Sequence, residues 1–408
     1  MKTLLVLAWR NLWRKKKRTL ITVSSVMFAA ILTIALMSIV SGMKQQMIES
    51  IVSNTTGHIQ IQDVLYDDEP SIDYALELSP EVMQLLEQHE NCIAYTVPRI
   101  QNFCLASKDI GTRGVLVTGI KPEKENKMNN VSSRITQGRM FNDNDNYAVV
   151  AEGVANQLEL ELGDTIVLLG NGFQGMIAAS KYKVGGIVRF PMPEQNNSMV
   201  YLPLAEAQWL FAAPDRVTNL IIMAEEHVDI DMLSADLQSS LDDEWFTVYT
   251  WEELLPDAIA AFEVRNAQVK MMAWILYAVV GFGILGTIIT MVFERMKEFG
   301  ILLSIGLKRI KLAAICMLET LLMSFLGVLA GIAIGYPLMY SLYKNPIPLK
   351  DDLADVMIDM GIEPVFAFSV APEIFLQQGL TVFFIAVAIG LYPVVKVLRL
   401  DMVKASRK

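Results

Sequence analysis

The chain has 408 residues, 53% of them hydrophobic, and a mean hydropathy of +0.38. That value is high for a soluble protein and low for a chain made only of membrane helices, so we expect membrane spans together with a soluble domain. The formal net charge is −10, and this acidic balance argues against nucleic acid as a partner.

A cytoplasmic amphipathic helix is predicted over residues 1–19. One face carries apolar residues at helical spacing, and the other carries Arg10, Asn11 and Arg14. We expect this helix to lie in the membrane interface. The alternative, a basic flank with two interfacial tryptophans, explains the charges but not the spacing of Leu4, Leu5, Ala8, Trp9, Leu12 and Trp13.

Four apolar stretches are long enough to cross a bilayer, which takes about 20 helical residues. The first exceeds the apolar core of a secretory signal and has no small-residue cleavage site after it, so we interpret it as a retained anchor. Glu319, in the third, is the only charged residue among them. The predicted transmembrane helices are residues 20–42, 271–293, 312–340 and 375–395.

The distribution of charge predicts the orientation, because short cytoplasmic segments are enriched in lysine and arginine. Seven basic residues and no acid precede the first span, and the segment 294–311 and the tail 396–408 hold five basic residues each. The rest of the chain outside the spans holds 17 basic and 40 acidic residues. Both termini are therefore predicted in the cytoplasm, with residues 43–270 and the loop 341–374 on the far side.

Residues 43–270 show the mixed pattern of an α+β domain. Residues 58–62 alternate like a strand, and Ser79-Pro80-Glu81 has the chemistry of a helix start. Short strands follow, and residues 219–249 indicate a β-α-β unit. We predict two lobes, a porter-like lobe at about 43–120 and 215–265 and a β-rich lobe at about 121–214, with a helix over 251–270 leading into the second span.

The motifs of nucleotide hydrolysis and metal catalysis are absent from the sequence. No G-x-x-x-x-G-K-[ST] loop is present, and His58, His89 and His227 lack the spacing of metal ligands. We therefore expect no catalytic site, metal or cofactor on this chain. Cys92 and Cys104 allow either a disulfide between neighbouring strands or two buried free thiols, and the small number of cysteines favours the thiols.

Two features of the third span indicate a functional or a packing role. Glu319 is a functional candidate because charges inside membranes are expensive, but it lies near the cytoplasmic end. It can equally reach the interface or pair with a basic residue of the amphipathic helix or the cytoplasmic segment. Gly327, Gly331 and Gly335 recur every four residues, which predicts a helix face for close packing.

The most informative segment is Glu294 to Gly306, on the predicted cytoplasmic side. It is interpreted as a short charged turn followed by an apolar helical face that can enter a groove on a soluble partner. The residues expected to couple the chain to that partner are Glu294, Arg295, Glu298, Phe299, Gly300, Leu302, Leu303 and Gly306.

With this segment the chain resembles the MacB/LolC/LolE/FtsX group of ABC transporter permeases, which share E-R-x-x-E-[IF]-G-x-L-x-x-x-G after the second span. The resemblance covers almost the whole chain and includes residues 57–61, Gly138-Arg139, residues 150–155, Leu162-Gly163-Asp164-Thr165 and Tyr392-Pro393. It implies a membrane α plus α/β fold class, with four transmembrane helices and a large two-lobed α+β periplasmic domain between helices 1 and 2.

The resemblance also implies partners and a location. A permease of this group works in the bacterial inner membrane, among lipids, with two copies of an ABC ATPase that binds ATP and Mg, and with a second permease copy or paralogue. The separate ATPase and the strand at 57–61 favour the LolC/LolE type, which passes lipoproteins to a periplasmic carrier. The alternatives are MacB-like efflux of periplasmic peptides or drugs and FtsX-like regulation of a cell-wall hydrolase.

Overall fold

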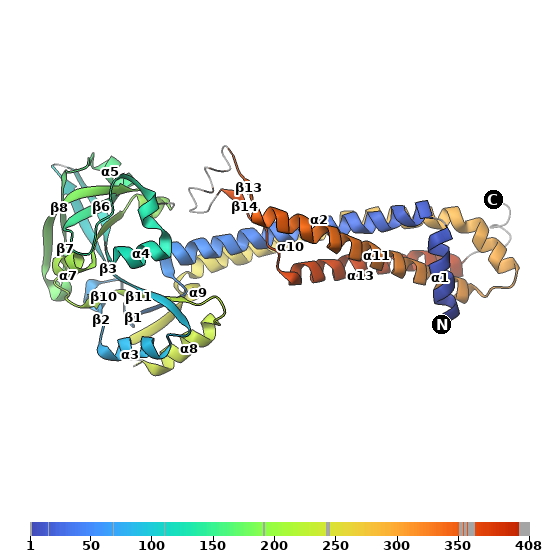
Figure 1. The fold of residues 1–408 in the computed structure, drawn as a ribbon, viewed down its shortest axis with the longest axis horizontal. Helices are drawn as coiled ribbons and strands as arrows, with labels where there is room; N and C mark the ends of the chain where they lie inside the picture. Colours follow the sequence, from blue (N-terminus) through green and yellow to red (C-terminus); the bar gives the residue numbers. More distant parts are fainter. Residues whose placement is uncertain are drawn as a thin grey trace. The chain divides into compact units, whose positions relative to one another are not determined.

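A computed structural model describes residues 2–399, apart from 15, 68, 110, 191, 242–244 and all of 351–363 except 354 and 357. The predicted tail beyond residue 399 and the middle of the predicted loop 341–374 therefore lie outside the described residues. The chain forms two compact units, which Figure 1 draws together. Residues 1–45, 261–348 and 365–408 make the helical unit, and residues 46–260 and 349–364 make the α/β unit.

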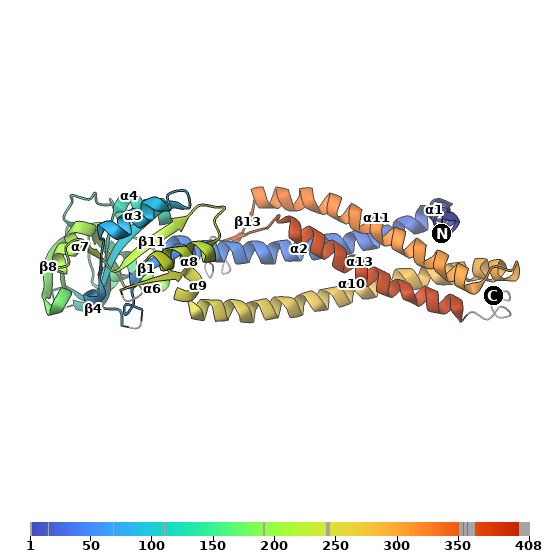
Figure 2. The same cartoon turned by 90° about the horizontal axis from the view of Figure 1, so that it is seen from below.

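Four helices of the described chain are long and apolar enough to cross a membrane. Each of them extends beyond its predicted span at both ends. In the helical unit they lie side by side in both views (Figures 1 and 2). A shorter helix, α1 (Lys2–Arg14), precedes them, and the four are α2 (Lys16–Ile51), α10 (Pro256–Ser304), α11 (Arg309–Lys344) and α13 (Pro372–Leu398).

The helix α11 is the most buried of the four. Its small residues let neighbouring backbones approach. A Cβ added to Gly327 would lie 2.6 Å from the Cβ of Val26 on α2, and one added to Gly331 would lie 2.7 Å from the Cβ of Ala30. At Gly335 the nearest atom would be 3.8 Å away, which is ordinary contact. The tight crossing of α11 and α2 therefore depends on the first two glycines.

The α/β unit is built on one ten-stranded sheet with the order β12-β1-β11-β3-β4-β9-β6-β8-β5, and β7 pairs with β3 and β8. These strands are β1 (Ile59–Asp63), β3 (Ile93–Lys108), β4 (Gly111–Ile120), β5 (Ile135–Gly138), β6 (Tyr147–Ala151), β7 (Thr165–Asn171), β8 (Ile177–Val188), β9 (Met199–Pro203), β11 (Asn219–Ala224) and β12 (Phe246–Thr250).

Within the described residues of this unit, seven short α-helices and several single turns connect the strands. The helices are α3 (Pro80–Gln88), α4 (Pro122–Asn129), α5 (Glu152–Gln157), α6 (Pro193–Asn196), α7 (Leu204–Leu210), α8 (Ile230–Ser240) and α9 (Trp251–Leu254). The turns are η1 (Val52–Thr56), η2 (Ile72–Tyr74), η3 (Val131–Arg134) and η4 (Phe173–Gly175). Two-residue strands form two further pairs, β2 (Leu76–Glu77) with β10 (Arg216–Val217) and, in the helical unit, β13 (Ile347–Pro348) with β14 (Val365–Phe366).

The predicted local elements have clear counterparts. The hydroxyl of Ser79 caps α3 with Pro80 at its first position, and β11, α8 and β12 form the expected β-α-β sequence. The predicted helix before the second span is interrupted, because Leu255 leaves the helical conformation and α10 begins at Pro256.

The predicted boundary between two lobes falls inside one sheet and one hydrophobic core. The strand β3 is 16 residues long; its first half pairs with β11 and its second half with β4 and β7. In Figure 1, β1 and β11 with α3 and α8 lie at one end of this sheet, and β6 and β8 with α5 lie at the other. Apolar side chains from both ends belong to a single buried cluster.

The cysteines of the α/β unit are free thiols. Cys104 is buried on β3, and burial raises the pKa of its thiol to about 12. Cys92 is half-buried just before the same strand.

Candidate functional site

The connection between α10 and α11 contains the sequence-predicted coupling residues. The expectation of a charged turn at its start is wrong, since α10 continues as a helix through Glu294 and Glu298 to Ser304. Gly306 follows the end of the helix, and its φ of +97° belongs to the left-handed region that glycine adopts without steric cost. The amide of Gly306 donates to the carbonyl of Leu303 at 3.1 Å, and α11 begins at Arg309.

A buried ion pair joins this end of α10 to α11. The guanidinium of Arg295 donates to one carboxylate oxygen of Glu319, and the side-chain amide of Asn11 on α1 donates to the other oxygen at 2.8 Å. Arg295 is 3% exposed and Glu319 is 1% exposed. Of the roles weighed for Glu319, the structure therefore has it paired with a basic residue of the segment 294–311, and α1 contributes the side-chain amide of Asn11 in addition.

Further contacts extend this cluster. The guanidinium of Arg295 also lies 3.4 Å from the carboxylate of Glu298, which lies 3.6 Å from the guanidinium of Arg14 on α1. The guanidinium of Arg295 also lies 5.2 Å from the ring centre of Phe299. Charges buried as deeply as those of Arg295 and Glu319 are stable only when they are paired and hydrogen-bonded. These contacts therefore hold the ends of α1, α10 and α11 together. We call the set Asn11, Arg14, Arg295, Glu298 and Glu319 the helix-end network.

The apolar residues of the segment divide between two faces of α10. The side chains of Phe299 and Leu303 are 1% and 6% exposed and pack within the helical unit. Their spacing of four residues puts both on the inward face. Gly300 is buried beside them. That Phe299, Leu303 and Leu302 enter a groove on a partner stays a prediction. The residues that face outward are Ile301, Leu302 and Ile305, which are 59%, 38% and 78% exposed.

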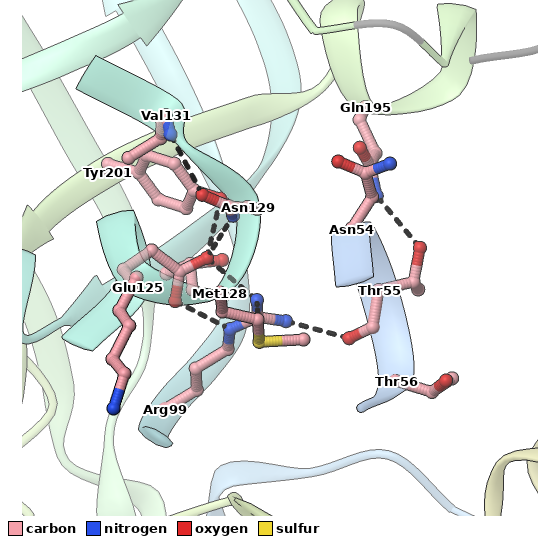
Figure 3. Close-up of polar contacts among 12 residues, drawn as sticks. Asn54, Thr55, Thr56, Arg99, Glu125, Met128, Asn129, Val131, Gln195 and Tyr201 are labelled. Atoms are coloured by element: carbon pink, nitrogen blue, oxygen red, sulfur yellow. Dashed lines mark hydrogen bonds and ion pairs between the residues drawn. The ribbon is translucent and has the colours of Figure 1, made fainter. Parts of the chain in front are cut away.

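A second buried network lies in the α/β unit, where η1 follows α2 (Figure 3). Arg99 on β3 donates two hydrogen bonds to the carboxylate of Glu125 on α4, at 3.0 and 2.7 Å, and a third to the backbone carbonyl of Thr55 at 2.9 Å. Asn129 donates to the same carboxylate at 2.5 Å, and the hydroxyl of Tyr201 lies 3.4 Å from it. This network fastens η1 to the sheet.

Sequence reasoning missed both Asn11 and the Arg99–Glu125 pair. Asn11 is one of several polar residues that the sequence places on a single face of α1, and Arg99 and Glu125 stand 26 positions apart in different elements. No local pattern connects such residues. Among the described residues, no group of three His, Cys, Asp or Glu side chains is placed to hold a metal ion.

Four long apolar helices, with an α/β unit inserted after the first and a charged network at the helix ends, define the class of a membrane permease subunit. Comparison with known families is consistent with this class. The MacB-like periplasmic core domain matches residues 19–240, and the FtsX-like permease C-terminal domain matches residues 270–402.

Individual relatives extend the comparison. The lipoprotein-releasing system transmembrane protein LolC of Neisseria meningitidis is 22% identical over 345 residues, which cover 80% of each chain. An uncharacterised ABC transporter permease of Methanocaldococcus jannaschii is 28% identical over 209 residues, 49% of this chain and 50% of the relative. The chain thus spans about half the length of that relative. The periplasmic region of MacB from Actinobacillus actinomycetemcomitans aligns with a TM-score of 0.37 at 14% identity, over 53% of this chain and 98% of that one.

The chain belongs to the MacB/LolC/LolE/FtsX group of ABC transporter permeases. The members of this group are permease components of ABC transporters.

Proposed function

We propose that this chain is the membrane subunit of a transporter that extracts lipoproteins from the bacterial inner membrane and passes them to a periplasmic carrier. Two copies of a separate ATPase bind ATP and Mg in the cytoplasm, and a second copy or a paralogue of this chain completes the permease. The chain crosses the membrane four times with both termini in the cytoplasm, and the two ends of the periplasmic sheet act as the two lobes.

The helix-end network is the observation that carries this mechanism. An ATPase seated on Ile301, Leu302 and Ile305 pushes on the end of α10. The buried Arg295–Glu319 pair ties that end of α10 to α11, and the hydrogen bond from Asn11 to Glu319 ties α11 to α1. A force on the end of α10 therefore moves the three helices together. The helices α2 and α10 each contribute residues to both units, so their motion reaches the periplasmic domain.

The choice of lipoproteins as cargo rests on the extent of the likeness to lipoprotein-releasing proteins. LolC of Neisseria meningitidis and LolE of Haemophilus influenzae align over 80% and 84% of this chain, each at 22% identity. MacB-like efflux and FtsX-like regulation of a hydrolase are the competing functions, and each makes a different prediction for what copurifies.

Copurification from membranes tests cargo and partners together. The tagged full chain should bring down an ABC ATPase and acylated proteins, and ATP should release those acylated proteins to the soluble fraction. Capture of an outer-membrane channel with peptide export, or of a hydrolase with no released cargo, would replace lipoprotein release by the corresponding alternative.

A photo-reactive residue placed at Ile305 tests the docking surface. It should crosslink to the ATPase, whereas the same residue at Ile275, which is also an exposed isoleucine but lies far along α10, should not. Equal crosslinking at both positions would remove the segment's assigned role.

Cysteine labelling tests the orientation. A membrane-impermeant thiol reagent applied to spheroplasts should label an Asn171→Cys variant, which is exposed on β7, and should leave a Lys308→Cys variant unlabelled. The opposite pattern would invert the topology.

A further inference from the structure

A groove of about 510 Å³ lies where α1 packs against α2 and α11, within the helical unit. Its volume falls in the range of small-ligand sites, about 300–1,000 Å³. Its walls are apolar except near the start of α2, where two lysines and a threonine contribute. The lining residues are Trp9, Leu12, Trp13, Lys16, Lys17, Thr19, Leu20, Val23, Leu326 and Ala330.

The groove is shaped by the way α1 is attached to α2. The hydroxyl of Thr19 donates to the backbone carbonyl of Leu12 at 2.8 Å, which satisfies a carbonyl at the end of α1 and fixes the bend between the helices. Leu12 is buried against residues of α10 and α11, whereas Trp9 and Trp13 remain 44% and 57% exposed, with ring centres 6.0 Å apart. Tryptophans with this partial exposure are typical of the membrane interface.

The chemistry of the walls selects the occupant. A peptide or a polar metabolite would leave its hydrogen-bonding groups unpaired in so apolar a groove, at a considerable cost in binding free energy. A hydrocarbon chain has no such groups. Lys16 and Lys17 are exposed, and the predicted amphipathic segment 1–19 contains no acidic residue, so the polar end of the occupant should carry a negative charge.

We propose that this groove binds one anionic phospholipid of the cytoplasmic leaflet. An acyl chain lies along Leu20, Val23, Leu326 and Ala330, and the headgroup phosphate pairs with Lys16 and Lys17. The choice of leaflet rests on the orientation given under the proposed function, whereas the binding itself does not.

The position of the lipid gives it a consequence for coupling. The same helix, α1, contributes Asn11 to the helix-end network, where it donates to the buried carboxylate of Glu319. A lipid that fills the groove holds α1 against α2 and α11, and thereby keeps Asn11 in place. Anionic lipid should therefore stabilise the helix ends on which the ATPase acts.

Native mass spectrometry of the purified full chain in mixed micelles tests the site. With phosphatidylglycerol as the probe, one lipid should stay bound, and phosphatidylcholine, which has the same chains and no net charge, should be retained at least about tenfold less well. The double change Lys16→Gln and Lys17→Gln should weaken phosphatidylglycerol retention by up to about 30-fold, because it removes the attraction of two basic side chains to the anionic headgroup. The groove-filling change Ala330→Phe should abolish retention of either lipid.

Matched controls separate the groove from general attraction to the membrane. Lys308→Gln with Lys311→Gln removes two exposed charges near the start of α11, and Leu329→Phe adds an aromatic ring at an exposed position on α11; neither changes a lining residue, so both should retain the lipid. Equal retention of the two lipids, or equal loss in the groove and control variants, would overturn the proposal. Because the measurement needs no ATPase or cargo, failure of the proposed transport function would leave its outcome unchanged.

Discussion

Removing one partner of the Arg295–Glu319 pair should destabilise the helical unit severely. Both side chains are almost fully buried, so Glu319→Met leaves the guanidinium of Arg295 without its main counter-charge, and Arg295→Met does the same to the carboxylate. Loss of one member of a buried pair costs about 3–5 kcal/mol. The double variant removes both charges and fills the space with apolar groups, so it should recover most of that loss.

A double-mutant cycle on the purified chain measures this effect. Thermal unfolding midpoints in detergent should fall sharply in each single variant and return toward wild type in the double variant, which is a strongly non-additive result. The exposed Glu294→Gln, on the same helix, is the control and should leave the midpoint unchanged. Single variants as stable as the control, or a double variant whose loss equals the sum of the single losses, would refute the argument from buried charge.

Three further predictions concern other parts of the chain. Arg99→Met should destabilise the α/β unit by about 3–5 kcal/mol and increase hydrogen exchange at η1, because the buried carboxylate and the carbonyl that bind its guanidinium both lose their donor; unchanged exchange at η1 would contradict this. Gly327→Leu should disrupt the α11–α2 crossing and lower the thermal midpoint, whereas Gly335→Leu, where the packing is looser, should be tolerated; equal effects would argue against close packing. Hydrogen bonds from His89 to a backbone carbonyl of α3 and to Asp236 raise the pKa of its imidazole. The protonated imidazole therefore stabilises the fold fully below the unfolded pKa of about 6.5, and this stabilisation is lost as pH rises through the folded pKa. Asp236→Asn should flatten that part of the stability–pH curve, and an unchanged curve would exclude the pair as its cause.

The sequence predicts elements better than it predicts the partners of buried charges. Hydropathy locates the four long helices because each is longer than any other apolar run, and the cap at Ser79 is a local pattern that the fold keeps. The faces of α10 could not be assigned in this way. Phe299, Leu302 and Ile305 are all apolar, so periodicity does not distinguish the side that packs inside from the side that remains exposed.

The two-lobed prediction illustrates a different limit. Alternation and glycines mark the ends of strands in sequence, but they do not show that β3 continues from one half of the sheet into the other. Pairing between distant strands depends on tertiary contacts, and those contacts merge the two predicted lobes into one core.

The pairing of β1 with β12 has a consequence for how the periplasmic domain can be exchanged. The chain enters the sheet at β1 and leaves it at β12, and these strands are direct neighbours, with Ile59 opposite Thr250. The amide of Trp251 donates to the carbonyl of His58 at 3.1 Å and closes the junction. The two ends of the inserted domain are therefore fixed about one strand spacing apart, roughly 4.8 Å. A relative's domain that keeps this antiparallel junction, and keeps an arginine in the place of Arg99 to bind the carbonyl of Thr55, can replace residues 58–251 as a single cassette.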